Sequence, residues 1–129
     1  MPNAKHPQAQ KFYVYEFRAG WVPFYVGIGR ANRDRDRIRY VRRQMKRKKL
    51  GESSKWVSHT RVLAKLISCG HQVEAHRTRK GPRRKEALVL EKKRILRLVH
   101  SAHELANVHY NPSRPSAAQV VQFIVRNQN

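Results

Sequence analysis

The stretch FYVYEFRAGWVPFYVGIGR, residues 12–30, decides the fold that this sequence predicts. Its two ends, residues 12–17 and 24–28, are rich in the aromatic and β-branched side chains that are typical of strands. The segment between them contains Gly20 and has the length of a hairpin connection somewhat longer than the tightest type. We therefore expect two strands that pair antiparallel.

Strand alternation assigns faces to the side chains of this hairpin. Successive side chains point to opposite sides of a strand, so Tyr13 and Tyr15 share one face of the first strand. In the second strand, the same rule places Tyr25 on the same face as Gly27. The opposite face of the second strand is expected to carry Phe24, Val26 and Ile28.

The net charge of the chain narrows what it can bind. The 129 residues suit one compact domain, and 40% of them are hydrophobic, which is enough for a single core. Lysine and arginine number 29 against 8 acidic residues, a formal net charge of +21. Such a charge repels itself unless a polyanion neutralises it, and nucleic acid is the expected polyanion. An anionic membrane surface is the weaker alternative, because no long basic helix carries a clean aromatic face.

A concentrated basic segment follows the hairpin, between residues 30 and 49. Ile38, Val41 and Met45 recur at the spacing of one helical face, so we expect a helix that docks on the sheet through them. A solvated face is the ordinary interpretation of such a charge run, but the charge of the whole chain favours contact with phosphate. The basic residues expected to contact nucleic acid are Arg30, Arg35, Arg39, Arg42, Arg43, Lys46 and Lys55.

The remainder of the chain predicts two more core helices and a third strand. A helix is expected over about residues 55–69, because a serine can cap its start and Gly70 suits its end. A strand over residues 71–78 and a helix over about residues 82–99, with proline at its first turn, complete the order β-β-α-α-β-α. We assign a disordered tail to residues 1–10, the domain to residues 11–112, and an extension with a short helix to residues 113–129.

Several functional classes are excluded or made improbable by what the chain lacks. The N-terminal residues 1–10 carry no apolar segment of a secretory signal, so we expect a cytoplasmic protein. No apolar run approaches the ~20 residues of a membrane span. Cys69 is the single cysteine, which excludes an intramolecular disulfide, and the pair His100 and His103 lacks the further ligands of a metal site.

One acidic residue falls inside the apolar sector of the helix over residues 82–99. Glu91 follows Leu88 by three residues and precedes Ile95 by four, whereas Glu86 falls on the polar side. A carboxylate turned toward a core is costly unless it is paired, hydrogen-bonded or bound to a cation. Either an arginine pairs with Glu91, or Glu91 belongs to a metal or phosphate-transfer site. The apolar sector consists of Ala87, Leu88, Ile95, Leu98 and Val99.

Two tyrosine triplets stand on the two predicted strands. Tyr13-Val14-Tyr15 is followed about ten residues later by Tyr25-Val26-Gly27, then by a basic helix and a helical glutamate. This ordered set resembles the GIY-YIG nuclease family, although Tyr13 and Val14 replace the glycine and isoleucine of the first triplet. The run PFYVGIGRANR, residues 23–33, is similar to the branch in which a short glycine-containing loop leads to an arginine. The resemblance covers roughly residues 12–107.

The resemblance implies a fold and a cation. The implied fold is a small α/β (α+β) domain, in which a three-stranded antiparallel sheet is flanked by helices. The resemblance selects Glu91 rather than Glu86 as the ligand of one Mg²⁺ or Mn²⁺ ion, and it adds Asn107 as a following site residue. A hard cation such as Mg²⁺ suits a single carboxylate, because it keeps most of its waters.

The resemblance also implies roles in phosphodiester cleavage. Arg33 would stabilise the transition state through a bidentate contact with the phosphate. Tyr15 and Tyr25 would hold or deprotonate the attacking water. A tyrosine has an ordinary pKa of about 10, so it acts as a base only if the metal and the arginines lower that pKa. The sequence does not say which of the two tyrosines acts.

The chain departs from the family pattern at two places. Family members often carry histidine or tyrosine one turn after the arginine, where this chain has Arg37, and Tyr40 on the same helical face is the expected replacement. Arg37 is therefore an alternative catalytic arginine, with Arg33 as a phosphate clamp. The resemblance ranks Arg33 first, because the Gly-Ile-Gly-Arg-Ala-Asn loop, residues 27–32, places it where the arginine of the family falls. His59 stands where some relatives carry a lysine, and a hydrogen-bonded core histidine is the alternative.

These observations predict a metal-dependent endonuclease that hydrolyses nucleic acid, DNA in preference to RNA. The alternative is a non-catalytic basic nucleic-acid-binding module, in which the tyrosines are sheet residues and Glu91 is a salt-bridged core acid. Both predict binding that weakens steeply with salt, and only the first predicts cleavage. The sequence indicates no oligomeric state.

Overall fold

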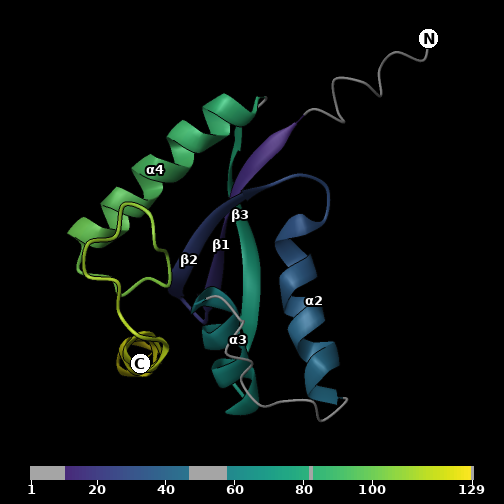
Figure 1. The fold of residues 1–129 in the computed structure, drawn as a ribbon, viewed down its shortest axis with the longest axis vertical. Coiled ribbons are helices and arrows are strands. Elements are labelled where there is room, and N and C mark those ends of the chain that lie inside the picture. Colours follow the sequence, from purple (N-terminus) through teal and green to yellow (C-terminus); the bar gives the residue numbers. More distant parts are fainter. Residues whose placement is uncertain (1–10, 47–57, 82, 129) are drawn as a thin grey trace.

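The structure is a computed structural model that describes residues 11–46, 58–81 and 83–128. The predicted order β-β-α-α-β-α is confirmed, and one more helix follows it (Figure 1). The tail assigned to residues 1–10 and the expected phosphate ligand Lys55 lie outside the described residues. The elements are β1 (Phe12–Ala19), β2 (Val22–Gly29), α2 (Arg33–Lys46), α3 (Ser58–Ser68), β3 (Val73–Gly81), α4 (Arg84–His100) and α5 (Ala117–Asn127).

The three strands form one antiparallel sheet in the order β2-β1-β3, so the mixed α/β fold class is confirmed. The central strand β1 pairs with both neighbours, and Tyr15 lies opposite Gly27 on β2 and Arg77 on β3. Each pairing contains one register shift, between Phe17 and Arg18 toward β2 and between Val14 and Tyr15 toward β3. Such shifts turn a strand locally and redirect its side chains.

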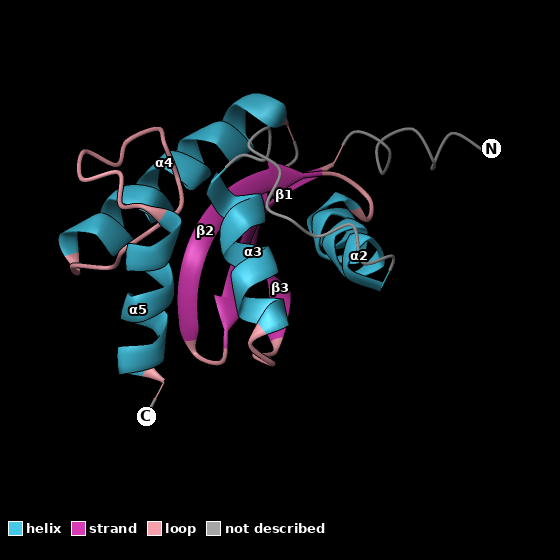
Figure 2. Cartoon of the chain, turned by 60° about the horizontal axis from the view of Figure 1, so that its bottom comes forward, coloured by secondary structure: helices cyan, strands magenta, loops and turns pink. Residues whose placement is uncertain are grey.

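Helices cover both faces of the sheet (Figure 1 and Figure 2). On one face, Tyr13, Tyr15 and Phe17 of β1 pack with α2 and α3 in the larger hydrophobic cluster. On the other face, Val14 of β1 and Val26 of β2 pack with α4. The stripes predicted for α2 and α4 supply these contacts, together with an apolar stripe on α3. The buried or half-buried members of the stripes are Ile38, Val41 and Met45 of α2, Leu63, Leu66 and Ile67 of α3, and Ala87, Ile95, Leu98 and Val99 of α4.

Two predicted placements are wrong. Phe24 does not share a face with Val26, because the register shift opposite Phe17 makes Phe24 an extra residue in β2. Its ring packs 6.1 Å from that of Phe17 in the larger cluster. Leu88 was expected in the apolar sector of α4 but is exposed, because it lies at the edge of the stripe, where the sheet does not cover it.

The C-terminal helix α5 belongs to the same core as the sheet. A capping box between Ser116 and Gln119 starts the helix, and Val120 and Ile124 are buried in the larger cluster, against α3 and β2. Within the described ranges, no helix combines the length and the apolar character that crossing a bilayer requires.

Candidate active site

Two tyrosines from neighbouring strands begin the site. Tyr15 of β1 and Tyr25 of β2 lie on the face covered by α2 and α3, with ring centroids 6.3 Å apart. Gly27 makes this arrangement possible, because a Cβ atom there would lie 2.8 Å from Cζ and Oη of Tyr15 and 3.0 Å from Cε2 of Tyr25. The third position of the Tyr-Val-Gly triplet therefore needs glycine for a steric reason: the phenol of Tyr15 lies over its backbone.

Helices α2 and α3 complete a pocket of about 800 Å³ around these tyrosines. Arg33 and Arg37 are one helical turn apart on α2 and enter the pocket together. Tyr40 follows on the same face, with the Arg37 guanidinium 5.7 Å from the centre of its ring. From α3, the imidazole of His59 stacks on Tyr25 at a centroid distance of 4.2 Å. The structure thus brings Tyr15, Tyr25, Arg33, Arg37, Tyr40 and His59 to one hollow.

Burial decides the protonation of the aromatic groups in the pocket. Burial raises the pKa of Tyr15, and the neighbouring Tyr25 raises it further, while Arg33 opposes the change. Burial and then Glu91 raise the pKa of Tyr25, against Arg37 and Arg33. Burial and Arg37 lower the pKa of His59 to about 4. At neutral pH both phenols are therefore O–H donors, and His59 is a neutral imidazole.

Glu91 of α4 is a half-buried carboxylate without a cation partner among the described residues. The ion pairs of these residues involve Glu16, Asp34, Glu74 and Glu86, and none includes Glu91. Burial raises the pKa of Glu91, while His109 and Arg84 lower it. Glu91 does not line the tyrosine pocket, but its charge raises the pKa of Tyr25, which does.

A cation held here would have few protein ligands. The described residues contain no cluster of three or more His, Cys, Asp and Glu side chains suited to a metal ion. Asp36 also lines the pocket but is exposed on the first turn of α2. A half-buried carboxylate that forms no ion pair with another described residue fits Mg²⁺, which binds through one or two carboxylates and keeps its waters for exchange with phosphate oxygens.

The turn that leads to Arg33 is held by a buried network that begins at Tyr13. The Tyr13 hydroxyl donates to the Ala31 carbonyl at 2.7 Å and lies 3.0 Å from Asp34 Oδ1. From β3, Arg77 donates to the same carbonyl at 2.7 Å and to Asp34 Oδ2 at 2.9 Å. Ala31 has a φ of 51°, a left-handed conformation that these bonds stabilise. The network fixes the first turn of α2, and hence the position from which Arg33 reaches the pocket.

This network gives Tyr13 and Asp34 structural roles that the tyrosine triplets do not predict. Tyr13 occupies the position of the glycine in the first triplet of the GIY-YIG family. In this structure its hydroxyl bonds the backbone of Ala31 and of Asp34 and so holds the loop before α2. Although burial alone would raise the pKa of Asp34, hydrogen bonds from Arg77 and Tyr13 hold it below its ordinary value. The partner of Asp34, Arg77, is distant in sequence, and nothing in the sequence links the two positions.

Asn107 lies outside the pocket and supports β2. Its side-chain carbonyl accepts from the Val26 N–H at 2.9 Å, and its amide donates to the Val26 carbonyl at 2.8 Å. The neighbouring Ala106 N–H donates to the Phe24 carbonyl at 2.7 Å. The buried Asn107 side chain thus holds Val26, and the Ala106 backbone holds Phe24, so we assign Asn107 to positioning the strand that carries Tyr25.

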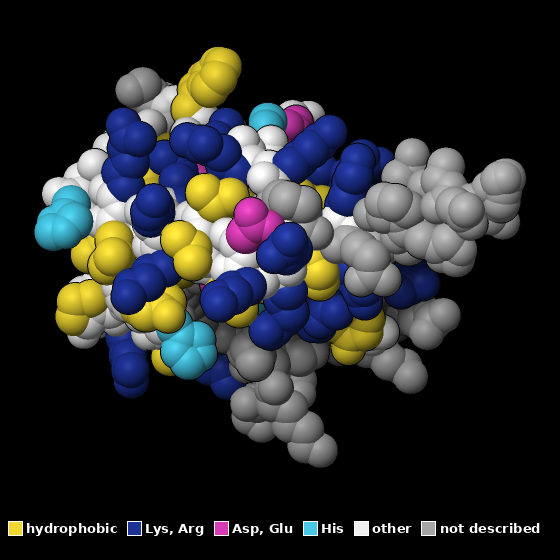
Figure 3. All heavy atoms as spheres, turned by 90° about the horizontal axis from the view of Figure 1, so that it is seen from above, with side chains coloured by type: hydrophobic (Ala, Val, Ile, Leu, Met, Phe, Trp, Pro, Cys, Tyr) yellow, Lys and Arg dark blue, Asp and Glu magenta, His cyan; other side chains and the backbone are white. Residues whose placement is uncertain are grey.

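The predicted phosphate ligands divide into two groups. Arg30, Arg39 and Arg43 line the pocket with the tyrosines, whereas Arg35, Arg42 and Lys46 are exposed on α2 and do not line it. Lysine and arginine side chains spread over much of the face seen in Figure 3, with few acidic side chains among them. The described part of α2 is therefore a basic wall beside the pocket.

Comparison of the chain with protein-family models, with curated proteins and with solved structures finds no significant match. The resemblance to the GIY-YIG nucleases accordingly depends on the two triplets, on the arginines of α2 and on the placement of Glu91.

Proposed function

We propose that this chain is a divalent-cation-dependent endonuclease that cleaves phosphodiester bonds in nucleic acid, with DNA as the favoured substrate. One observation carries the proposal: a single pocket collects Tyr15, Tyr25, Arg33 and Arg37, and the half-buried carboxylate of Glu91, which forms no ion pair with another described residue, acts on Tyr25. A surface that only binds phosphate needs the arginines but gains nothing from an inward, uncompensated acid.

The arginines bind and orient the phosphate in this proposal. Arg33 has no acidic partner among the described residues, so its guanidinium is available for two parallel hydrogen bonds to one phosphate. Arg37, one turn later, contacts the next phosphate or shares the first. Additional negative charge that develops on the phosphate is stabilised by these two cations.

In this proposal the two tyrosines orient the attacking water, and His59 supports Tyr25. Both phenols keep their protons at neutral pH, because burial raises their pKa. They therefore orient the water by hydrogen bonding, and His59 keeps Tyr25 in place by stacking. Glu91 would hold one Mg²⁺ or Mn²⁺ ion, which would acidify a bound water and neutralise charge on the phosphate.

A cleavage assay tests this proposal. Supercoiled plasmid and a labelled RNA are incubated with the full chain in Mg²⁺, in Mn²⁺ and in EDTA, and the assay is repeated with Glu91→Gln and Arg33→Gln. Each variant has a matched control on a surface away from the pocket, Glu86→Gln on α4 and Arg126→Gln on α5. We expect cleavage that needs the cation, loss of cleavage in both site variants, and wild-type cleavage in both controls.

The rival proposals predict different results in the same assay. If the wild-type chain binds DNA and RNA but leaves both intact with either cation, the non-catalytic binding module is the correct function. If Asp36→Asn abolishes cleavage and Glu91→Gln does not, the ion is held from α2 rather than from α4.

A further inference from the structure

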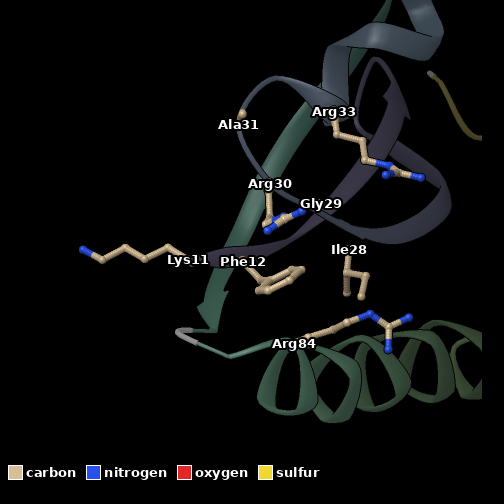
Figure 4. Close-up of a pocket in the computed structure, with 8 residues that line it drawn as sticks. All are labelled: Lys11, Phe12, Ile28, Gly29, Arg30, Ala31, Arg33 and Arg84. Atoms are coloured by element: carbon tan, nitrogen blue, oxygen red, sulfur yellow. The ribbon is translucent and has the colours of Figure 1, made fainter. Parts of the chain in front are cut away.

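A second hollow of about 660 Å³ adjoins the candidate active site, between β1, the loop before α2 and the start of α4 (Figure 4). It shares four lining residues with the tyrosine pocket: Ile28, Arg30, Ala31 and Arg33. The two hollows are therefore adjacent, and Arg33 lines both. A strand whose phosphate contacted Arg33 would have its adjacent nucleotide beside this second hollow.

The second hollow has an apolar floor. The half-buried ring of Phe12 and the half-buried side chain of Ile28 form it. The Arg30 guanidinium lies 5.1 Å from the centre of the Phe12 ring. In Figure 4, Arg84 of α4 approaches this floor from the side opposite Arg30. Aromatic rings and guanidinium planes are the surfaces on which unpaired bases stack.

The cations around this floor form no ion pairs with the described acids. Arg30, Arg33 and Arg84 are absent from the ion pairs of the described residues, although Arg30 lies over the Phe12 ring and Arg84 acts on the charge of Glu91. A phosphate alone would use these cations without needing Phe12 and Ile28. A base-paired nucleotide cannot use the floor, because its base is already stacked within a duplex. The combination suits a nucleotide whose base is free to leave the stack.

We propose that the hollow formed by Phe12, Ile28, Arg30 and Arg84 binds one unpaired nucleotide next to the phosphate held by Arg33, with the base on the apolar floor. The preferred substrate is therefore nucleic acid with a single-stranded or opened segment. This inference rests on the proposed function for the position of the cut, but base binding is measurable without cleavage.

Binding in EDTA tests the proposal, with fluorescence anisotropy of a labelled oligothymidylate and of an abasic oligomer with the same number of phosphates. We expect Phe12→Ala to weaken binding of the oligothymidylate roughly 5- to 100-fold, the scale of one lost base–aromatic stack. Binding of the abasic oligomer, and of a fully paired duplex, should change less than about twofold, because neither presents a base to the floor. Trp21→Ala is the control, since Trp21 is 87% exposed at the hairpin turn and lines neither hollow.

Two further variants separate stacking from folding and from charge. Phe12→Leu keeps an apolar side chain at the start of β1 but removes the ring face, so it should reproduce the base-dependent loss with an unchanged melting temperature. Arg84→Gln should weaken both oligomers equally and reduce the salt slope of binding by about 0.7, whereas Lys85→Gln, outside the hollow, should not.

The possible outcomes distinguish this inference from the nuclease proposal. Equal loss on the normal and abasic oligomers, or no loss on either, overturns the nucleotide site even if the chain cleaves DNA. A base-dependent loss upholds the site even if no cation supports cleavage.

Discussion

Glu16 and Glu91 both lie on the side of the sheet covered by α4, yet among the described residues only Glu16 of the two forms ion pairs. Glu16 on β1 is fully buried and pairs with Arg18 at 3.0 Å and with Arg94 of α4. Glu91 precedes Arg94 by three residues on the same helix, a spacing at which ion pairs form readily. Arg94 nevertheless turns to the strand and leaves Glu91 without a partner among the described residues. Glu104 is also half-buried and forms no ion pair with another described residue, but of these two acids only Glu91 acts on a tyrosine of the pocket.

The largest expected effect is on cleavage by Glu91→Gln. The substitution keeps the size and polarity of the side chain but removes the anionic ligand of the cation. We expect the cleavage rate to fall roughly 10²- to 10³-fold, the scale of one strong electrostatic contribution to the transition state. DNA affinity in EDTA should not fall, because no positive charge is lost.

The same cleavage assay with Glu16→Gln tests whether Glu16 and Glu91 have different roles. Glu16 lies in the core under α4, so a folded Glu16→Gln protein should retain cleavage within a few-fold of wild type. Loss of cleavage in Glu16→Gln, with Glu91→Gln active, would reverse the roles that we assign to the two acids.

The second effect is on stability. We expect Glu16→Gln to lower the free energy of unfolding more than Glu91→Gln does. Replacing Glu16 leaves Arg18 and Arg94 without their carboxylate. Both arginine side chains reach solvent, at 24% and 29% exposure, so the loss should stay near the lower range for a broken buried pair, about 1–3 kcal/mol. Urea unfolding followed by circular dichroism measures it. In a double-mutant cycle with Arg94→Gln, the two losses should be less than additive, and full additivity would show that the pair contributes nothing.

The element order was predictable because its signals are local. The alternation of β1, the apolar stripes of α2 and α3, and the glycine after α3 each depend on residues within one turn or one strand. Phe24 was misplaced because a register shift depends on how two strands pair, which alternation along one strand does not contain.

The pairing of the acids was not predictable for a related reason. Glu16 and Arg94 are 78 residues apart, while the local helix rule favours Glu91 with Arg94. The spacing of Glu91 from Leu88 and Ile95 correctly predicted that it lies on the inner side of α4, because the face of a helix depends only on nearby residues. Which arginine pairs with which acid depends on how the strands and helices pack. The ion pair between Arg94 and Glu16 and the bond from Arg77 to Asp34 both arise in this way.

The pH dependence of stability should have opposite signs for Glu91 and Asp34. Burial raises the pKa of Glu91 above its ordinary 4.5, so the folded state binds this proton more tightly than the unfolded state. Stability from Glu91 is therefore present below pH 4.5 and is lost as pH rises through the raised pKa. Glu91→Gln should be more stable than wild type at pH 7, and the difference should vanish below pH 4.5.

Asp34 provides the opposite case. Its pKa lies below the ordinary 3.8, so its contribution is present above pH 3.8 and is lost as pH falls through the depressed pKa. Asp34→Asn should be less stable than wild type at neutral pH, and the gap should narrow in strong acid. Thermal melts of the three proteins across the acid range measure both signs. Equal pH profiles for Glu91→Gln and wild type would mean that Glu91 is as well solvated folded as unfolded.

The smallest expected effect separates removal of a cation from removal of an acid. Arg43 lines the tyrosine pocket at the far end of the basic wall, beyond Arg37 and Tyr40, so it should contact the strand without touching the cleaved phosphate. Arg43→Gln should reduce the slope of log affinity against log salt by about 0.7–0.9, the loss of one phosphate contact, and leave cleavage at saturating protein unchanged. Glu91→Gln should leave that slope unchanged while abolishing cleavage. If Arg43→Gln instead lowers cleavage at saturating protein as strongly as Glu91→Gln does, that result contradicts the assignment of Arg43 to substrate binding and of Glu91 to catalysis.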